Sequence, residues 1–151
     1  MAITIVNRSK YAMILCIQHI DLEGPETLGA CFSEHGYNLG ICNLHRGDKL
    51  PADLSGLDAV VSLGGPMNVY EEKEYPFLVD EDRFLKQVIA GKVPFLGICL
   101  GSQLLSKAAG GQVTRSPKPE IGWFNIELTE EGRRDPLFQG LPSRLEVYQW
   151  H

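Results

Sequence analysis

The chain has 151 residues, of which 44% are hydrophobic and 22% charged, a composition typical of one globular domain and not of a disordered or fibrous protein. Its formal net charge is −5 and its 14 Lys and Arg residues are scattered, so we expect no nucleic-acid-binding surface. No apolar stretch approaches the ~20 residues that span a membrane. Four cysteines without the spacing of a disulfide framework favour a reducing compartment such as the cytoplasm.

The N-terminal region faintly imitates a signal peptide, because Arg8 and Lys10 precede the apolar run 11–17. That run ends at Gln18 and His19, and no small-residue cleavage site follows it. We therefore interpret it as the first strand of the core.

Short apolar strand candidates alternate with amphipathic helix candidates along the chain. Strands are predicted at 12–18, 38–44, 57–63 and 93–96, helices at 25–35, about 78–90 and 102–109, and short β-like pieces near 112–115, 123–128 and 145–149. The alternation predicts a single α/β domain over 1–151, with an open, mostly parallel sheet and helices on both of its faces.

Residues Gly97-Ile98-Cys99-Leu100-Gly101 lie between the predicted strand 93–96 and the predicted helix 102–109. A cysteine on such a sharp strand-to-helix turn is the arrangement of a nucleophile elbow, in which flanking glycines leave room for strained and crowded backbone. The helix N-terminus would also favour the thiolate form of Cys99. Cys16, Cys31 and Cys42 lack this setting, so each is predicted to be a small buried hydrophobe.

Three features are predicted to meet at the carboxyl ends of the parallel strands, where open α/β sheets bind ligands. They are His19, the Gly64-Gly65-Pro66 segment and Cys99. Glycine backbone can approach an oxyanion closely and aim an N–H at it, although Gly-Gly-Pro is also an ordinary turn. His19 could shape the rim of the pocket or act as a base.

The remaining polar and aromatic features have simpler interpretations. We expect His35 and His45 to be exposed to solvent, and the acidic segment 71–74 to be a solvated loop. Trp123 and Phe124 begin a β-like stretch and are expected to pack in the core.

The motifs, taken in order, resemble the class I (triad-type) glutamine amidotransferases, especially free-standing members similar to the glutaminase domain of GMP synthase. They are Gln18-His19, Glu23-Gly24-Pro25, Gly64-Gly65-Pro66, the elbow with Gln103 after it, Glu120-Ile121-Gly122-Trp123 and Gln149-Trp150-His151. The resemblance covers nearly the whole chain and implies a flavodoxin-like fold.

The resemblance also assigns roles. Cys99 would attack the side-chain amide of glutamine, and His151 would act first as base and then as acid. The backbone N–H groups of Gly65 and Leu100 would form the oxyanion hole.

In the same family pattern Gly64 and Gln103 would help to hold the substrate glutamine. No cofactor, metal, nucleic acid or membrane is implied. The partner would be an ammonia-accepting synthetase, whose identity stays open.

This chain departs from the family at its end, because the family triad closes with His-x-Glu and the sequence stops at His151. We expect a domain truncated at the catalytic histidine, with little glutaminase activity and a tendency to self-associate through the strand that precedes His151. Three functions remain open: a glutaminase that supplies ammonia, a γ-glutamyl peptide hydrolase, and a non-catalytic amidotransferase-like binding protein.

Overall fold

The computed structural model describes residues 12–151, and Arg8 and Lys10 lie outside them. The described chain forms two compact units, of which the first ends at Val113 and the second spans Thr114–His151.

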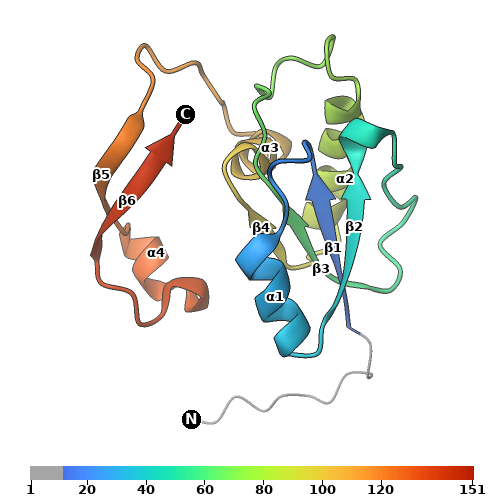
Figure 1. The fold of residues 1–151 in the computed structure, drawn as a ribbon, viewed down its shortest axis with the longest axis horizontal. Coiled ribbons are helices and arrows are strands. Elements are labelled where there is room, and N and C mark those ends of the chain that lie inside the picture. Colours follow the sequence, from blue (N-terminus) through green and yellow to red (C-terminus); the bar gives the residue numbers. More distant parts are fainter. Residues whose placement is uncertain (1–11) are drawn as a thin grey trace. The chain divides into compact units, whose positions relative to one another are not determined.

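The first unit is a four-stranded parallel sheet with helices between its strands (Figure 1). Its strand order is β2-β1-β3-β4, and all three neighbouring pairs are parallel. The predicted α/β fold is thereby confirmed, although the helix after the elbow begins two residues earlier than expected. In chain order the elements are β1 (Met13–Gln18), α1 (Glu26–Glu34), β2 (Asn38–Asn43), η1 (Leu44–Arg46), β3 (Leu57–Ser62), α2 (Phe77–Ala90), β4 (Phe95–Gly97) and α3 (Leu100–Ala108).

Helices cover both faces of this sheet because successive residues of a strand point to opposite sides. Leu15 and Ile17 of β1 pack into the larger buried cluster, to which α2 and α3 contribute. Ile14 and Cys16 pack into the smaller cluster on the other face, against Leu28 and Phe32 of α1. The nearly continuous apolar sequence of β1 is what a strand buried on both faces requires.

The second unit is an antiparallel pair of strands with short helical turns between them. Its elements are β5 (Ile121–Glu127), α4 (Glu130–Arg134), η2 (Pro136–Phe138) and β6 (Arg144–Trp150). The strand expected near 112–115 is not formed. Val113 packs on the core of the first unit without ladder pairing, and Pro117 and Pro119, which lack an N–H, follow shortly after it.

The prediction that Trp123 and Phe124 are core residues is wrong, because their exposed fractions are 67% and 38%. Trp123 contacts Tyr148 of β6 edge-on, with ring centroids 5.5 Å apart. A ribbon of two strands has two faces, and the pairing of Trp123 with Tyr148 covers only part of one.

No helix within residues 12–151 is both long enough and apolar enough to cross a membrane. Within the same residues no cluster of three or more His, Cys, Asp or Glu side chains has the arrangement of a metal site.

Candidate active site

Cys99 is the second of the two residues between the end of β4 and the start of α3, and its backbone is strained. Its φ and ψ are 52° and −111°, a combination that side chains with a Cβ rarely adopt. A Cβ added at Gly97 would lie 2.6 Å from the Cα of Ser102, and one at Gly101 would collide with the carbonyl oxygen of Ser62. The turn therefore requires glycine on both sides, and it presents Cys99 at a helix N-terminus.

The four thiols differ in their surroundings. Cys99 is exposed, whereas burial raises the pKa of Cys16 and Cys42 to about 11, as expected for inert core thiols. The expectation that Cys31 is buried is wrong, because it is exposed on α1. Leu28 and Phe32 form the face of α1 that packs on the sheet, and Cys31 lies beside that face rather than on it.

The Gly64–Gly65 segment, which follows β3, lies against the elbow. A Cβ added at Gly64 would be 3.6 Å from the Cβ of Cys99, and one at Gly65 would be 3.0 Å from the Cδ2 of Leu100. The N–H groups of Gly65 and Leu100 have no backbone or side-chain acceptor within residues 12–113. For Leu100 this follows from its place as the first residue of α3. Two unpaired donors thus lie near the thiol.

His19 is completely buried, and both of its ring nitrogens are engaged. Nδ1 lies 3.0 Å from the carbonyl oxygen of Gly64, and Nε2 lies 2.7 Å from Oε2 of Glu81. Neither nitrogen is available to take a proton from a thiol, so His19 is not an alternative base. It also does not line a pocket rim, because it has no solvent-exposed surface.

The electrostatics of His19 are dominated by its partner. Burial acts to lower the pKa of His19, but the hydrogen bond and the charge of Glu81 outweigh burial and raise it above its usual value. The carbonyl of Gly64 and the charge of Glu23 act in the same direction. The second carboxylate oxygen of Glu81 accepts a 2.7 Å hydrogen bond from Oγ of Ser62.

Glu81 and Ser62 were not among the residues predicted for the site. Both are completely buried, Glu81 on α2 and Ser62 at the end of β3. Glu81 left one signal in the sequence, because it occupies the apolar stripe of α2 between Leu78 and Leu85, at spacings of three and four residues. A carboxylate on a buried stripe needs a partner.

The other histidines outside the site are ordinary. His35 is exposed at the end of α1, as expected. His45 is less exposed than expected, because its Nε2 lies 2.7 Å from Oδ1 of Asp21 and its side chain is 18% exposed. The acidic segment 71–74 is mostly solvated, although Glu72 forms an ion pair with Lys107.

Gln103 and His151 lie in different units. Gln103 is half-buried on α3, one turn after the elbow, and its N–H donates to the carbonyl of Cys99 over 3.2 Å. His151 follows β6, where its N–H donates to the carbonyl oxygen of Glu120 over 3.0 Å and its Nε2 lies 2.9 Å from Oε2 of the same residue. The role of His151 as a base stays a prediction.

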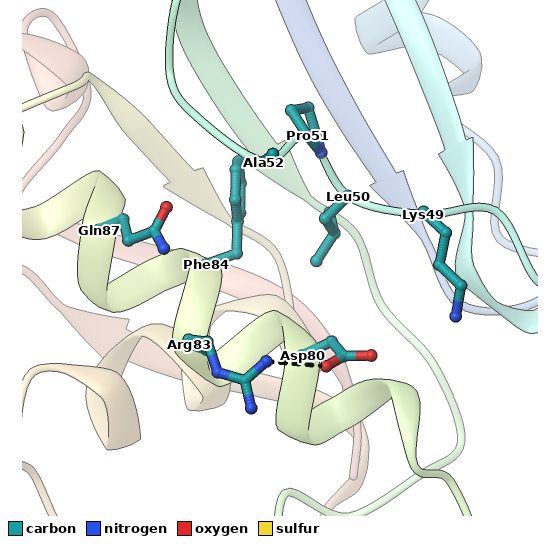
Figure 2. A pocket seen from close by; sticks show the side chains of 8 residues that line it. All are labelled: Lys49, Leu50, Pro51, Ala52, Asp80, Arg83, Phe84 and Gln87. Carbon is teal, nitrogen blue, oxygen red and sulfur yellow. Dashed lines mark hydrogen bonds and ion pairs between the residues drawn. The ribbon is translucent and has the colours of Figure 1, made fainter.

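Figure 2 shows a pocket that includes none of the elbow residues. It lies between the loop after η1 and the outer side of α2, where Arg83 and Asp80 form a 3.2 Å ion pair. The same helix thus carries Glu81 inward to His19 and lines this pocket with other residues. The lining residues are Lys49, Leu50, Pro51, Ala52, Asp80, Arg83, Phe84 and Gln87.

An exposed cysteine on a strained elbow, with unpaired N–H groups beside it, is the arrangement of a thiol-dependent acyl-transfer site on an α/β sheet. The chain belongs to the class-I glutamine amidotransferase family, whose pattern matches residues 25–151.

Individual relatives agree with this assignment. The chain is 36% identical over 135 residues to the glutamine amidotransferase-like protein YfeJ of Salmonella typhimurium, covering 85% of this chain and 56% of YfeJ. It is 36% identical over 110 residues to a glutamine-hydrolysing GMP synthase of Porphyromonas gingivalis, covering 73% of this chain and 20% of that enzyme.

Among solved structures, a glutamine amidotransferase from Thermotoga maritima superposes with a TM-score of 0.84 at 37% identity, covering 93% of this chain and 60% of that one. A glutamine amidotransferase from Methylobacillus flagellatus gives a TM-score of 0.80 at 32% identity, covering 94% of this chain and 55% of that one. The chain therefore spans little more than half the length of YfeJ and of these two structures.

Proposed function

We propose that this chain carries the glutaminase half-reaction of the family, in which the side-chain amide of glutamine is hydrolysed through a thioester on Cys99. The observation that carries this proposal is the strained backbone of Cys99 at the N-terminus of α3, beside two backbone N–H groups that have no acceptor within residues 12–113. Strain of this kind lowers stability and persists where the surrounding structure imposes it, most often at active sites.

The chemistry proceeds in two steps. The thiolate of Cys99 attacks the amide carbon of glutamine, and the resulting oxyanion is stabilised by the N–H groups of Gly65 and Leu100. The C–N bond breaks as His151 protonates the leaving ammonia, so that a γ-glutamyl thioester remains. Water, deprotonated by His151, then attacks the thioester carbon, and the C–S bond breaks to give glutamate and free thiol.

Two residues of the site would hold the substrate rather than react with it. Gly64 lies close to the Cβ of Cys99, and a side chain at this position would collide with the carboxylate of Glu23, so Gly64 would hold the substrate through its backbone. Gln103 lies one turn along α3 from the elbow and can hydrogen-bond to glutamine through its amide.

The ammonia would pass to a synthetase, which is either a separate partner or part of the same protein. Support comes from the GMP synthase of Porphyromonas gingivalis, of which the matched region is only 20%. The name of that enzyme joins glutamine hydrolysis to the synthesis of GMP.

Covalent labelling with 6-diazo-5-oxo-norleucine, a glutamine-like electrophile, tests the proposal without depending on turnover. We expect peptide mass spectrometry to place the label on Cys99 and free glutamine to protect it. The chain provides its own control in Cys31, which is exposed but lies within α1 rather than on an elbow. Iodoacetamide should modify both exposed thiols, whereas the glutamine analogue should select Cys99.

Two outcomes would contradict the proposal. A label on Cys31 in preference to Cys99 would show that exposure, and not the elbow, determines reactivity. Labelling of Cys99 without protection by glutamine would favour a reactive thiol in a protein that does not bind this substrate.

Cys99→Ser should abolish ammonia release and leave glutamine binding nearly intact, because a hydroxyl is similar in size but far less acidic.

A further inference from the structure

A buried polar network lies directly behind the oxyanion segment. His19, Glu81 and Ser62 have no solvent-exposed surface, and they are linked by the 2.7 Å contacts between His19 and Glu81 and between Ser62 and Glu81. A buried charged pair of this kind is often no more stabilising than apolar side chains of the same volume. Its presence in an otherwise apolar core therefore calls for a specific role.

The network ends on the carbonyl oxygen of Gly64, which is the contact that matters most. A carbonyl oxygen can only accept a hydrogen bond, so Nδ1 of His19 carries the proton and donates it over 3.0 Å. This holds whether the proton between Nε2 and Glu81 resides on the imidazole or on the carboxylate. The donor to Gly64 is thus set by geometry.

The carbonyl of Gly64 and the N–H of Gly65 belong to the same peptide group. In a trans peptide the two bonds point to opposite sides of the chain, and no cis peptide occurs within residues 12–151. While His19 holds the oxygen, the Gly65 N–H points away from His19. That N–H has no acceptor within residues 12–113 and lies next to the elbow.

A peptide between two glycines is unusually free to turn over, because no side chain on either residue resists the rotation. The turned-over peptide would direct the carbonyl oxygen of Gly64, instead of the Gly65 N–H, to the same side. A carbonyl dipole in that place would repel a developing oxyanion. A hydrogen bond to the oxygen is the simplest way to keep the correct orientation.

The same network also reaches the elbow. The carbonyl oxygen of Ser62 accepts a 2.9 Å hydrogen bond from the N–H of Ile98, and Gly101 packs directly on that carbonyl. Ser62 therefore contacts the elbow through its backbone and Glu81 through its side chain. The nucleophile and the oxyanion segment are held by one set of buried contacts.

We propose that His19 is a positioning residue for the oxyanion hole: its hydrogen bond to the Gly64 carbonyl keeps the Gly65 N–H directed at the reacting oxygen. Glu81 and Ser62 hold the imidazole in that orientation. The proposal rests on the proposed function, since it requires an oxyanion to form next to Cys99.

The test compares two double variants, His19→Asn with Glu81→Gln and His19→Leu with Glu81→Gln. Neither leaves a buried carboxylate without its partner. Asn and Leu both branch at Cγ into two heavy atoms, although Leu is the larger, and only the Asn side-chain amide can replace Nδ1 as a donor to Gly64. The pair therefore differs mainly in the one hydrogen bond on which the proposal depends.

Two reactions of Cys99 are measured in the full chain. Acylation by L-γ-glutamyl-p-nitroanilide, which is monitored as the release of p-nitroaniline in a single turnover, passes through an oxyanion. Alkylation by iodoacetamide displaces iodide without forming one. We expect acylation to be about 10- to 100-fold slower in the Leu variant than in the Asn variant. The iodoacetamide rates should be the same in both variants.

Val60→Ala provides a matched control, because Val60 is a fully buried residue of β3 whose side chain belongs to the apolar cluster and forms none of the hydrogen bonds of this network. It reports what a general loss of stability does to the two rates. Equal acylation rates in the Asn and Leu variants would overturn the proposal. The proposal would also be overturned if the Leu variant lost acylation and alkylation to the same extent, as a variant destabilised like Val60→Ala does at an equal Tm.

If the double variants do not fold, Ser62→Ala removes only the hydroxyl that holds Glu81, and the same selective loss, on the order of a few-fold, is expected. No selective loss in that variant would also overturn the proposal. If wild-type Cys99 is not acylated at all, the proposed function itself fails. If wild type is acylated and no variant changes the rate selectively, only the role of His19 fails.

Discussion

The strain at Cys99 can be measured by removing its Cβ. At an ordinary helical position Ala is more stabilising than Gly by about 0.5–1 kcal/mol, because Gly loses more backbone freedom on folding. At Cys99, with φ of 52° and ψ of −111°, the Cβ contributes about 1–3 kcal/mol of strain that Gly relieves. We therefore expect Cys99→Gly to be more stable than Cys99→Ala, by about 1 kcal/mol.

Cys31 is the matched site, since it is also an exposed cysteine but lies within α1. There the order should reverse, with Cys31→Ala more stable than Cys31→Gly. The entropic difference between Gly and Ala is common to both sites, so subtracting one comparison from the other leaves the strain itself, about 1–3 kcal/mol.

Urea denaturation of the four variants measures these differences in the free energy of unfolding. In thermal denaturation the Gly variant at position 99 should have a Tm about 2–4 °C above that of the Ala variant. Ala more stable than Gly at position 99, by the same margin as at position 31, would refute the reasoning. The backbone at the elbow would then be no more strained than that of a helix.

Gly101→Ala should lower the free energy of unfolding by about 1–3 kcal/mol and suppress selective labelling of Cys99, because the added methyl group collides with the carbonyl of Ser62; an unchanged urea midpoint would contradict this. The pair of His19 and Glu81 should make stability depend on pH. Burial lowers the His19 pKa, but Glu81 raises it above the unfolded value of 6.5, so the stabilisation is complete below that value and is lost as pH rises through the folded pKa. Urea midpoints measured as pH rises through the folded pKa of His19 should fall in wild type and stay flat in the double variant His19→Asn with Glu81→Gln. Free glutamine should have a higher kcat/KM than γ-glutamyl dipeptides, and the opposite preference would favour a peptide hydrolase. The exposed aromatic side chains of the β5–β6 ribbon should cause concentration-dependent self-association in sizing chromatography, and a monomer at all concentrations would exclude it.

Local signals were sufficient for the sheet and the elbow. The strand β1 is apolar on both faces, and Gly97 and Gly101 bracket Cys99 at the spacing that a tight turn needs. Such features depend on residues close together in the chain, so their physical cause can be read from a short window of sequence. The approach of Gly64 to Cys99 was also predictable, because parallel strands end at a common edge.

Contacts between residues far apart in the sequence were harder to predict. Glu81 is 62 positions from His19, and a carboxylate on a helix surface is usually solvated, so its burial depends on how α2 packs on the sheet. The exposure of Trp123 has a similar origin, because an aromatic residue in a strand is buried only if something covers that face. In both cases the deciding information is tertiary.

The register of the sheet explains why the site forms at all. Three residues pair across β1, β3 and β4, namely Ile17, Ser62 and Gly97. Two residues after this row come His19, Gly64 and Cys99, so the segments that follow β1, β3 and β4 leave the sheet at the same level. The histidine can then reach the carbonyl of Gly64 over 3.0 Å while the other side of that segment lies against the elbow. Because the buried sheet specifies its register strongly, the relative placement of nucleophile, oxyanion segment and positioning histidine is set by the same packing that stabilises the fold.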